Sequence, residues 1–532
     1  MSGVRRFGKT RRFLTGVGTV SVIGIVGCVA LLQPRRESLN PWLLHYRVLL
    51  EGGGRLYRCV RVGVQVTNDY KRNVTDADEQ SAWDIIHERC ARLLVDLCET
   101  NGGMYVKLGQ DFARLSHIIP TQYTQALGKL HDNVARRPAS EVIGVIERDL
   151  GKPMSDIFES FDEVPVAAAS LAQVHRGVLK GSHDEVAVKV QYIDIADRFD
   201  GDMATMTLMM YLCGKLFPGS DFTEIIQRLE GVVRDELNFV REVENAEKCR
   251  KQLEEKFGDR FCVPKVFGGP LLTRRVVMTE FIHGVKITDL AGLKGPKMGF
   301  SNRQIATISE DMIDAFSYQM FCTGFVHCDP HPGNLLVRRH PRRTGQPQLV
   351  ILDHGLYVSF PDDLRHHFTN MWTACVLHDT DKVISLSRAI GVDEWEWLAA
   401  MFLEHPYDVY SPFKRMASQA DLDLMRKAMR EDMQKMSDIL KILPAVYGMV
   451  LRNVTNVRAA QKLMGSPTSR TLRMLRWSLP LSDGAQAMSW WQLYCLSWKL
   501  WAQETVHRGM LAYAVWRNPE LMKAVDDVLL MG

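Results

Sequence analysis

The spacing of apolar residues changes near residue 161, and this change restricts the fold class more than any other feature. The runs VPVAAASLAQVHRGVL and EVAVKVQY, between Phe161 and Tyr192, favour three short strands with a turn at residues 180–184. Apolar residues recur at helical intervals from about residue 79 to 132 and again after residue 362. We therefore predict an α+β fold, in which a small antiparallel sheet separates a helical N-terminal extension from a largely helical C-terminal region.

Length and composition narrow the class of protein. At 532 residues the chain exceeds what one hydrophobic core usually supports, and 46% hydrophobic with 24% charged residues are typical of a globular protein. The formal net charge is only +4, which excludes a strong overall positive potential that would attract nucleic acid. The eleven cysteines include no Cys-x-x-Cys pair, so the sequence favours neither a zinc site nor a disulfide framework.

The first 36 residues predict import and membrane anchoring. Five basic residues lie within residues 1–12, no acidic residue precedes Glu37, and residues 13–32 carry no charge. A helix of twenty residues is about 30 Å long, which is enough to cross a bilayer. We predict a mitochondrial import signal merged with a single-pass anchor, with a cleaved presequence or a secretory-pathway anchor as alternatives. The sequence EGGGR at residues 51–55 predicts a flexible joint behind the anchor.

Four short motifs occur in the order in which protein kinases present their catalytic residues. The tetrapeptide VAVK ends a predicted strand, glutamates follow on a predicted helix, HCDPHPGN forms a loop, and DHG comes after a further predicted strand. Each motif alone is common, but their order and context are specific. The candidate residues are Lys189, Glu242 with Glu244 as its alternative, Asp329 and Asn334 of the loop, and Asp353.

These residue types suit phosphoryl chemistry. A lysine on a strand reaches the α- and β-phosphates of ATP or ADP, but it is flexible and needs a helix carboxylate such as Glu242 to hold it. Asn334 and Asp353 offer the hard oxygen ligands that Mg²⁺ prefers, and Asp329 would face the attacking group. The two prolines of HCDPHPGN restrict the loop to few conformations. We interpret His327 and His331 as hydrogen-bonded loop residues rather than metal ligands.

The chain resembles the UbiB or aarF-domain-containing kinases, atypical relatives of protein kinases, and most of all their animal mitochondrial members. The strings that carry the resemblance span about residues 80–360 and are KLGQ, AAAS, SLAQVH, HCDPHPGN and DHGLY. It implies a two-lobe, protein-kinase-like fold with a targeting and transmembrane segment (1–36), a helical extension (37–160), an N-lobe (161–290) and a C-lobe (291–532). It also implies an inner-membrane protein of mitochondria that is connected with coenzyme Q or other lipid metabolism.

The resemblance assigns further residues to the site. In the family, a Lys-x-Gly-Gln helix covers the site and its lysine meets a Glu-x-Asp motif. Lys107, Gln110 and Glu236 match these motifs, whereas position 238 is Asn and removes one carboxylate from the expected contact. Alanines stand where protein kinases have a glycine-rich loop, and their Cβ atoms restrict the approach of the backbone to phosphates. This alanine loop comprises Ala167, Ala168, Ala169 and Ser170.

Three functions are compatible with these motifs. The first is a Mg²⁺-dependent atypical kinase or ATPase with a nucleotide and membrane lipids or lipid-metabolism proteins as partners. The second is a serine/threonine kinase acting in trans on mitochondrial proteins, and the third is a nucleotide-binding pseudokinase scaffold. LYVSF leads directly into Pro361 and Asp362, which predict a helix start, so little platform remains for a peptide substrate. This favours the first function.

Overall fold

The computed structural model describes residues 41–73, 80–113, 120–131, 136–216, 223–404, 442–465 and 470–483, and single residues 407, 439, 468, 498 and 502. The predicted import signal and anchor lie outside these residues. Within them, no helix combines the length and the apolar character needed to cross a membrane. The chain forms two compact units, the first comprising Met1–Met154, Asp162–His175 and Lys189–Val233, and the second Ser155–Phe161, Arg176–Val188 and Arg234–Gly532.

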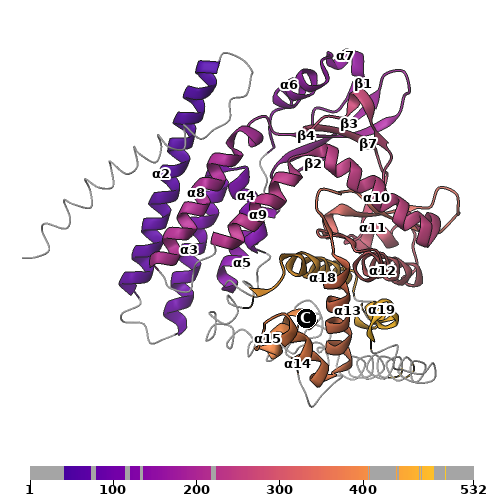
Figure 1. Cartoon of the computed structure of the whole chain (residues 1–532). Helices are drawn as coiled ribbons and strands as arrows, with labels where there is room; N and C mark the ends of the chain where they lie inside the picture. Colours follow the sequence, from indigo (N-terminus) through magenta and orange to yellow (C-terminus); the bar gives the residue numbers. More distant parts are fainter. Residues whose placement is uncertain are drawn as a thin grey trace, which may run out of the picture. The chain divides into compact units, whose positions relative to one another are not determined.

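Helices build the first unit, as the sequence predicts for its N-terminal extension. Helix α2 packs against α3 and α8, and α4 packs against α3, α5 and α8 (Figure 1). Helix α3 ends where Gly102 adopts a positive φ of 64°, which a glycine tolerates without strain. The helices are α2 (Pro41–Asn73), α3 (Gln80–Asn101), α4 (Met104–Ala113), α5 (Thr121–Gly128), α6 (Ala139–Leu150) and α8 (Ile195–Leu216). Two further helices, the four-residue α7 (Met154–Ile157) and the longer α9 (Thr223–Glu236), begin in the first unit and end in the second.

The predicted joint at EGGGR is wrong, because α2 runs through it as one continuous helix. A Cβ on Gly52 or Gly53 would meet no described atom within 4 Å, so packing does not demand these glycines. Each glycine costs about 1 kcal/mol of helix propensity. The helix persists because Leu56 and Cys59 are buried, and because Arg55 forms a buried ion pair with Asp202 of α8.

A six-stranded sheet contains the predicted strands. Its order is β1-β3-β4-β7-β6, with β2 paired to β3, and strands β3 and β4 run from one unit into the other. The turn at residues 180–184 joins β3 to β4 as predicted, whereas β1 was not predicted. The strands are β1 (Phe158–Phe161), β2 (Ala167–Ala168), β3 (Ala172–Leu179), β4 (Glu185–Gln191), β6 (Val266–Phe267) and β7 (Val276–Glu280).

The second unit adds two smaller sheets. One has the order β5-β11-β10-β8, and the other pairs β9 with β12. The antiparallel β10–β11 pair is the predicted basic hairpin. The strands are β5 (Phe261–Cys262), β8 (Val285–Lys286), β9 (Phe325–His327), β10 (Leu335–Arg339), β11 (Pro347–Ile351) and β12 (Tyr357–Ser359).

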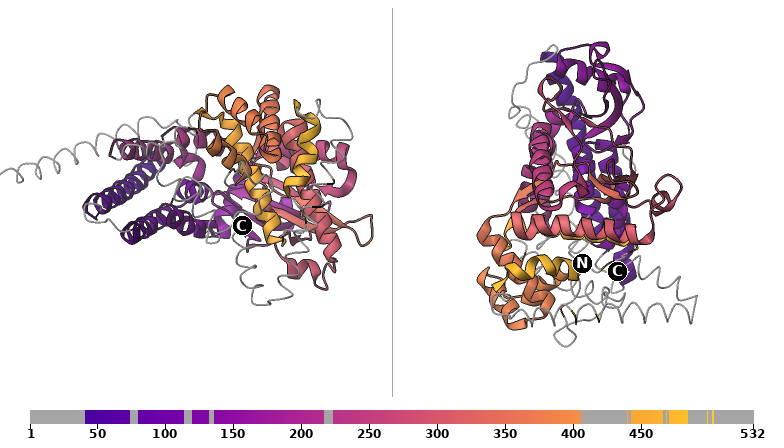
Figure 2. Two further views of the ribbon diagram at one scale, coloured as in Figure 1. Left: turned by 90° about the horizontal axis from the view of Figure 1, so that it is seen from below. Right: turned by 90° about the vertical axis from the view of Figure 1, so that its right-hand side faces the viewer.

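Helices make up most of the remaining second unit, and those of its C-terminal part gather against one another (Figure 2). Their core is rich in fully buried aromatic side chains, among them Phe316, Trp372, Phe402 and Tyr447. The helices are α10 (Phe239–Phe257), α11 (Leu290–Lys294), α12 (Asn302–Ser317), the π-helix η4 (Tyr318–Thr323), α13 (Asp362–Leu377), α14 (Thr380–Ala389), α15 (Trp395–Leu403), α18 (Ala445–Leu463) and α19 (Arg470–Ser478). The predicted α+β class is confirmed.

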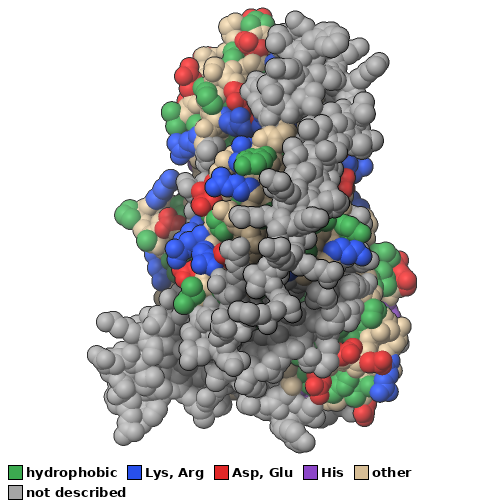
Figure 3. All heavy atoms as spheres, turned by 90° about the vertical axis from the view of Figure 1, so that its left-hand side faces the viewer, with side chains coloured by type: hydrophobic (Ala, Val, Ile, Leu, Met, Phe, Trp, Pro, Cys, Tyr) green, Lys and Arg blue, Asp and Glu red, His purple; other side chains and the backbone are tan. Residues whose placement is uncertain are grey.

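One face of the described surface carries mixed charge. On the face drawn in Figure 3, the coloured Lys and Arg side chains are interspersed with Asp, Glu and hydrophobic side chains. This mixture agrees with the small net charge of the sequence. The functional site is therefore better sought in local groupings of residues than in an overall field.

Candidate active site

Two loops of the second unit bring together the residues predicted to bind magnesium. Asn334 directly precedes β10, and Asp353 follows β11 by two residues. Leu335 pairs with Ile351 at the end of this antiparallel hairpin, and the Leu352 amide donates to the Asn334 carbonyl at 3.0 Å. Asn334 and Asp353 therefore lie at the same end of the hairpin, although they are 19 positions apart in the sequence.

The loop of Asp329 is joined to the loop of Asp353 by the β9–β12 pair. His327 is opposite Tyr357 in this pair, and the Cys328 amide donates to the Leu356 carbonyl at 3.0 Å. Asp329 comes two residues after β9, and Asp353 comes four residues before β12. Two independent strand pairs thus hold the three predicted residues Asp329, Asn334 and Asp353 in one region of the second unit.

The histidines of this region are structural. The His327 ring stacks on the Tyr357 ring with centroids 4.7 Å apart, and His354 Nδ1 lies 2.9 Å from the Tyr357 hydroxyl. His327 is 1% exposed, and burial lowers its pKa, so its ring is neutral at physiological pH. His331 Nδ1 accepts a hydrogen bond from the Gly333 amide at 3.1 Å. His331 is therefore a hydrogen-bonded loop residue, as interpreted from the sequence. His327 is instead the last residue of strand β9, and its Nδ1 accepts a hydrogen bond from the Asp329 amide at 3.2 Å.

Helix α18 binds the carboxylate of Asp329 from the far end of the sequence. Arg452 Nη2 lies 2.9 Å from Asp329 Oδ2, and Asn456 Nδ2 donates to Asp329 Oδ1 at 2.8 Å. Asn453 of the same helix donates to the His327 carbonyl. Residues 452, 453 and 456 share one helical face, since positions four apart are neighbours on a helix. The sequence analysis missed these residues; the polar run RNVTN within an otherwise apolar segment was the available signal.

The start of α10 distinguishes the two candidate glutamates. Glu242 is buried at 9% exposure, whereas Glu244 is exposed. Glu242 is therefore the one that faces the protein interior. Asn238 is the N-cap of α10, and its side chain accepts a hydrogen bond from the Val240 amide at 3.2 Å. Glu236, at the end of α9, lies beside the DHG loop, because its Cγ would be 3.8 Å from a Cβ placed on Gly355.

The first unit holds Lys189 and the alanine loop. Lys189 is half-buried on β4, between the fully buried Val188 and Val190, as the alternation of a strand requires. Ala167 pairs with Val174 of β3, and the Ala169 amide donates to the Ala172 carbonyl at 2.8 Å. The loop that replaces a glycine-rich loop is therefore a folded turn against β3.

The KLGQ motif lies on α4 in the same unit. Lys107 is 9% exposed, and Gln110 Nε2 donates to the Leu130 carbonyl at 2.9 Å. A Cβ on Gly109 would lie 2.6 Å from Leu130 Cδ1 and 3.1 Å from Cys98 Sγ, so only glycine fits without rearrangement. The motif thus needs its glycine for close packing. The contacts predicted for Lys107 with Glu236, and for Lys189 with Glu242 and the phosphates, stay predictions.

Known proteins resemble this chain over most of its length. Residues 129–387 match the model of the ABC1 atypical kinase-like domain. The chain is 36% identical over 429 residues to the probable serine/threonine-protein kinase abkD of Dictyostelium discoideum, covering 80% of this chain but only 60% of that protein. It is 32% identical over 431 residues to AarF domain-containing protein kinase 1 of Mus musculus, covering 79% of each. A solved complex of Rv3197 with erythromycin from Mycobacterium tuberculosis gives a TM-score of 0.43 at 21% identity, over 73% of this chain and 95% of that chain.

Proposed function

We propose a function on one premise: the chain belongs to the family of AarF-domain-containing kinases, with their ABC1 atypical kinase-like domain and two-lobe kinase-like fold. It acts as an atypical kinase or ATPase of the UbiB type, binds Mg-ATP, and supports coenzyme Q or lipid metabolism in mitochondria. The predicted anchor at residues 13–32 would hold it in the inner membrane. The observation that carries the proposal is the convergence of Asp329, Asn334 and Asp353 on two strand pairs.

The donor set fits magnesium. Asn334 and Asp353 would hold the ion through an amide and carboxylate oxygens, which are its preferred ligands. The Gly355 amide donates to Asp353 Oδ1 at 2.9 Å and so fixes the direction of that carboxylate. When bound, magnesium neutralises charge on the transferred phosphoryl group. The chain's own contribution is thus a metal-facing pair whose orientation is set before the nucleotide binds.

Asp329 is the residue that would orient the attacking water or hydroxyl group. Arg452 and Asn456 occupy one lone pair on each of its oxygens, so the carboxylate cannot rotate freely. A fixed carboxylate holds a nucleophile in line with the phosphoryl group, which is where most of the rate gain of such enzymes arises. Lys189, oriented by Glu242, would neutralise the α- and β-phosphates. Lys107, Gln110 and Glu236 would form the cover.

The segment after the DHG loop supports this function over a protein kinase acting in trans. Tyr357–Ser359 is engaged as strand β12 with β9, and α13 begins at Asp362 with Pro361 as its N-cap. Little chain is left to form the peptide platform of a protein kinase. The protein kinase remains the second candidate, because relatives such as abkD carry that name. A pseudokinase scaffold is the third.

Turnover of ATP by the full chain in liposomes tests the proposal. We expect hydrolysis by the wild type and its loss in Lys189→Ala and in Asp353→Asn. The matched control is Asp362→Asn, an equal charge change at a side chain that is 91% exposed. Hydrolysis retained by Asp353→Asn would refute the metal role. Transfer of labelled phosphate to a mitochondrial protein, abolished by Asp329→Asn, would instead favour the protein kinase. Nucleotide binding without turnover would favour the scaffold.

A further inference from the structure

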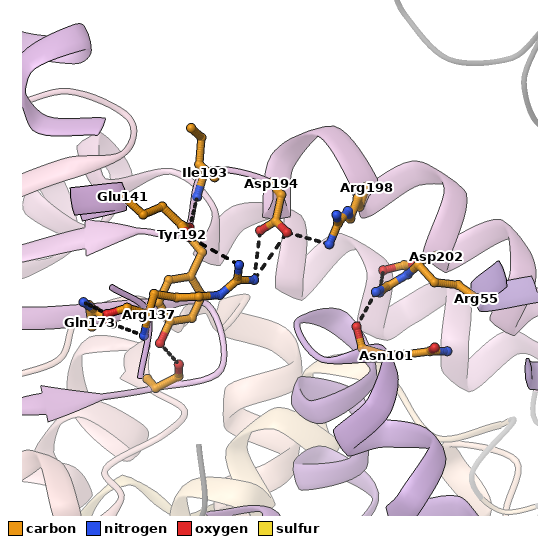
Figure 4. A network of polar contacts seen from close by, with 11 residues as sticks. Arg55, Asn101, Arg137, Glu141, Gln173, Tyr192, Ile193, Asp194, Arg198 and Asp202 are labelled. Carbon is orange, nitrogen blue, oxygen red and sulfur yellow. Dashed lines mark hydrogen bonds and ion pairs between the residues drawn. The ribbon is translucent and has the colours of Figure 1, made fainter. Parts of the chain in front are cut away.

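Tyr192 connects the strand of Lys189 with the alanine loop. It lies three residues after Lys189, and its hydroxyl donates to the Ala169 carbonyl at 2.9 Å (Figure 4). Its amide donates to the Leu171 carbonyl at 3.1 Å. Tyr192 is 5% exposed, and burial raises its pKa to about 12, so the hydroxyl keeps its proton at neutral pH. The Tyr192 side chain therefore binds the alanine loop at Ala169, and the Tyr192 backbone binds Leu171, the residue that directly follows this loop.

Arg137 holds the Tyr192 ring in place. Its guanidinium lies 5.1 Å from the centre of that ring, within the range of a cation–π contact. The same guanidinium bonds the Asp194 carboxylate at 3.2 and 3.3 Å. The Arg137 amide donates to Gln173 Oε1 at 3.0 Å, and the fully buried Gln173 returns a bond to the Arg137 carbonyl at 3.3 Å. Arg137 is thus tied at once to β3, to Tyr192 and to the start of α8.

These contacts of Arg137 are better suited to positioning the Tyr192 ring than to stabilising the fold. The Arg137 side chain is 34% exposed and that of Asp194 is 19% exposed, and ion pairs open to solvent contribute little to folding. The buried pair of Arg55 with Asp202 lies farther along α8, as Figure 4 shows, and serves stability instead. What Arg137 fixes is the orientation of one ring, and through that ring the position of one carbonyl oxygen.

That carbonyl has a direct effect on the donor next to it. The Ala169 carbonyl and the Ser170 amide belong to one peptide group, which is planar and trans, so their C=O and N–H point in opposite directions. A hydrogen bond that fixes the Ala169 carbonyl therefore also fixes the direction in which Ser170 N–H donates. Loops that cover nucleotides act through such backbone donors. In this loop the Cβ atoms of the alanines limit how closely the backbone can approach a phosphate. The direction of each N–H donor therefore has a larger effect on phosphate binding.

We propose that Arg137 and Tyr192 are positioning residues for the nucleotide: they fix the peptide group between Ala169 and Ser170 and so set the affinity of the alanine loop for phosphate. This inference rests on the proposed function. Arg137 lies two residues before α6, within the helical extension. Because nucleotide binding and the position of Arg137 both depend on this peptide group, the two are coupled, and each strengthens the other to the same extent.

The test uses the full chain and Tyr192→Phe, which deletes one hydroxyl and keeps the ring. We expect the Kd for a fluorescent ATP analogue and the KM for Mg-ATP to rise roughly fivefold to tenfold, the loss of one good hydrogen bond, while kcat changes less than twofold. Arg137→Gln should have a similar effect, and the double variant should be no worse than the stronger single variant, since both act through one peptide group.

The matched control is Tyr70→Phe, which deletes a hydroxyl bonded to Tyr123 at 2.8 Å elsewhere in the same unit and should leave Kd unchanged. Hydrogen exchange of residues 166–172 without nucleotide should be faster in Tyr192→Phe. An unchanged Kd in Tyr192→Phe, an equal rise in Tyr70→Phe, or unchanged exchange would each overturn the inference. Faster exchange together with a wild type that binds no nucleotide would refute the proposed function and leave the positioning of the loop supported.

Discussion

Replacing Arg55 by Gln should destabilise the first unit more than any comparable change on its surface. Arg55 Nε donates to Asp202 Oδ1 at 2.8 Å, a second contact joins Arg55 Nη2 to Asp202 Oδ2, and the guanidinium also donates to the Asn101 carbonyl. The side chains of Arg55 and Asp202 are 8% and 6% exposed. The variant would leave a carboxylate buried without its cation. Burial already raises the pKa of Asp202 even though Arg55 opposes that shift.

The size of the effect follows from this burial. Removing one partner of a buried pair costs about 3–5 kcal/mol, and for units of 150–250 residues each kcal/mol lowers Tm by about 2–4 °C. We therefore expect Tm to fall by roughly 6–20 °C. The matched control is Arg89→Gln, whose ion pair with Asp69 is 50% and 26% exposed and should cost at most about 1 kcal/mol.

Differential scanning calorimetry at pH 8 and pH 5 gives the decisive comparison. In Arg55→Gln the pKa of Asp202 in the folded state rises further above its unfolded value. Its protonated form is favoured by folding, so the penalty is small below the unfolded pKa and grows as pH rises. The Tm deficit should therefore be larger at pH 8 than at pH 5. Adding Asp202→Asn should restore part of the loss. Equal Tm values for Arg55→Gln and Arg89→Gln would refute the reasoning.

Three other predictions concern stability, each measured by urea unfolding. Gly109→Ala should cost about 1–3 kcal/mol of unfolding free energy through overpacking. Its control is Gly144→Ala, whose Cβ would meet no described atom within 4 Å and which should stabilise α6 by up to about 1 kcal/mol. Losses of equal size in the two variants would contradict the packing role of Gly109. Asn238→Ala should cost about 1 kcal/mol through the lost cap and Asn238→Asp nearly nothing, so equal losses would exclude capping. Desolvation raises the pKa of Asp311 to about 6 against the opposing charge of Arg260. Folding thus favours protonated Asp311. Relative to Asp311→Asn, the wild type should lose about 3 kcal/mol in all as pH rises from below 3.8 to above 6. A difference that stays constant with pH would contradict this.

Features that depend on neighbouring residues could be predicted from the sequence. The β10–β11 hairpin that places Asn334 and Asp353 follows from two apolar runs around a polar turn. The start of α13 at Asp362 follows from the proline before it. Helical geometry places Glu242 and Glu244 about 200° apart, so the sequence predicts that only one of them can orient Lys189. The order of the kinase-like motifs then predicted that these local features belong to one site.

Features that depend on packing between distant segments could not be predicted. The glycines at positions 52–54 predict a break, but the burial of Leu56 and the ion pair of Arg55 outweigh the propensity of three residues. The partner of Asp329 is Arg452, 123 positions away, and no periodicity in the sequence identifies that pair. Arg137 could not be predicted for the same reason, because its partners lie on β3, just after β4 and just before α8.

The bond from Asn453 to the His327 carbonyl has a practical consequence for producing the protein. Asn453, Val454 and Thr455 form an acceptor sequence for N-linked oligosaccharides. The sugar would be attached to the same amide nitrogen that donates to the loop, on a side chain that is 1% exposed. Expression through the secretory route of a eukaryotic host would therefore glycosylate the nascent chain at a position that folding must enclose. A bacterial or cytosolic host avoids this conflict.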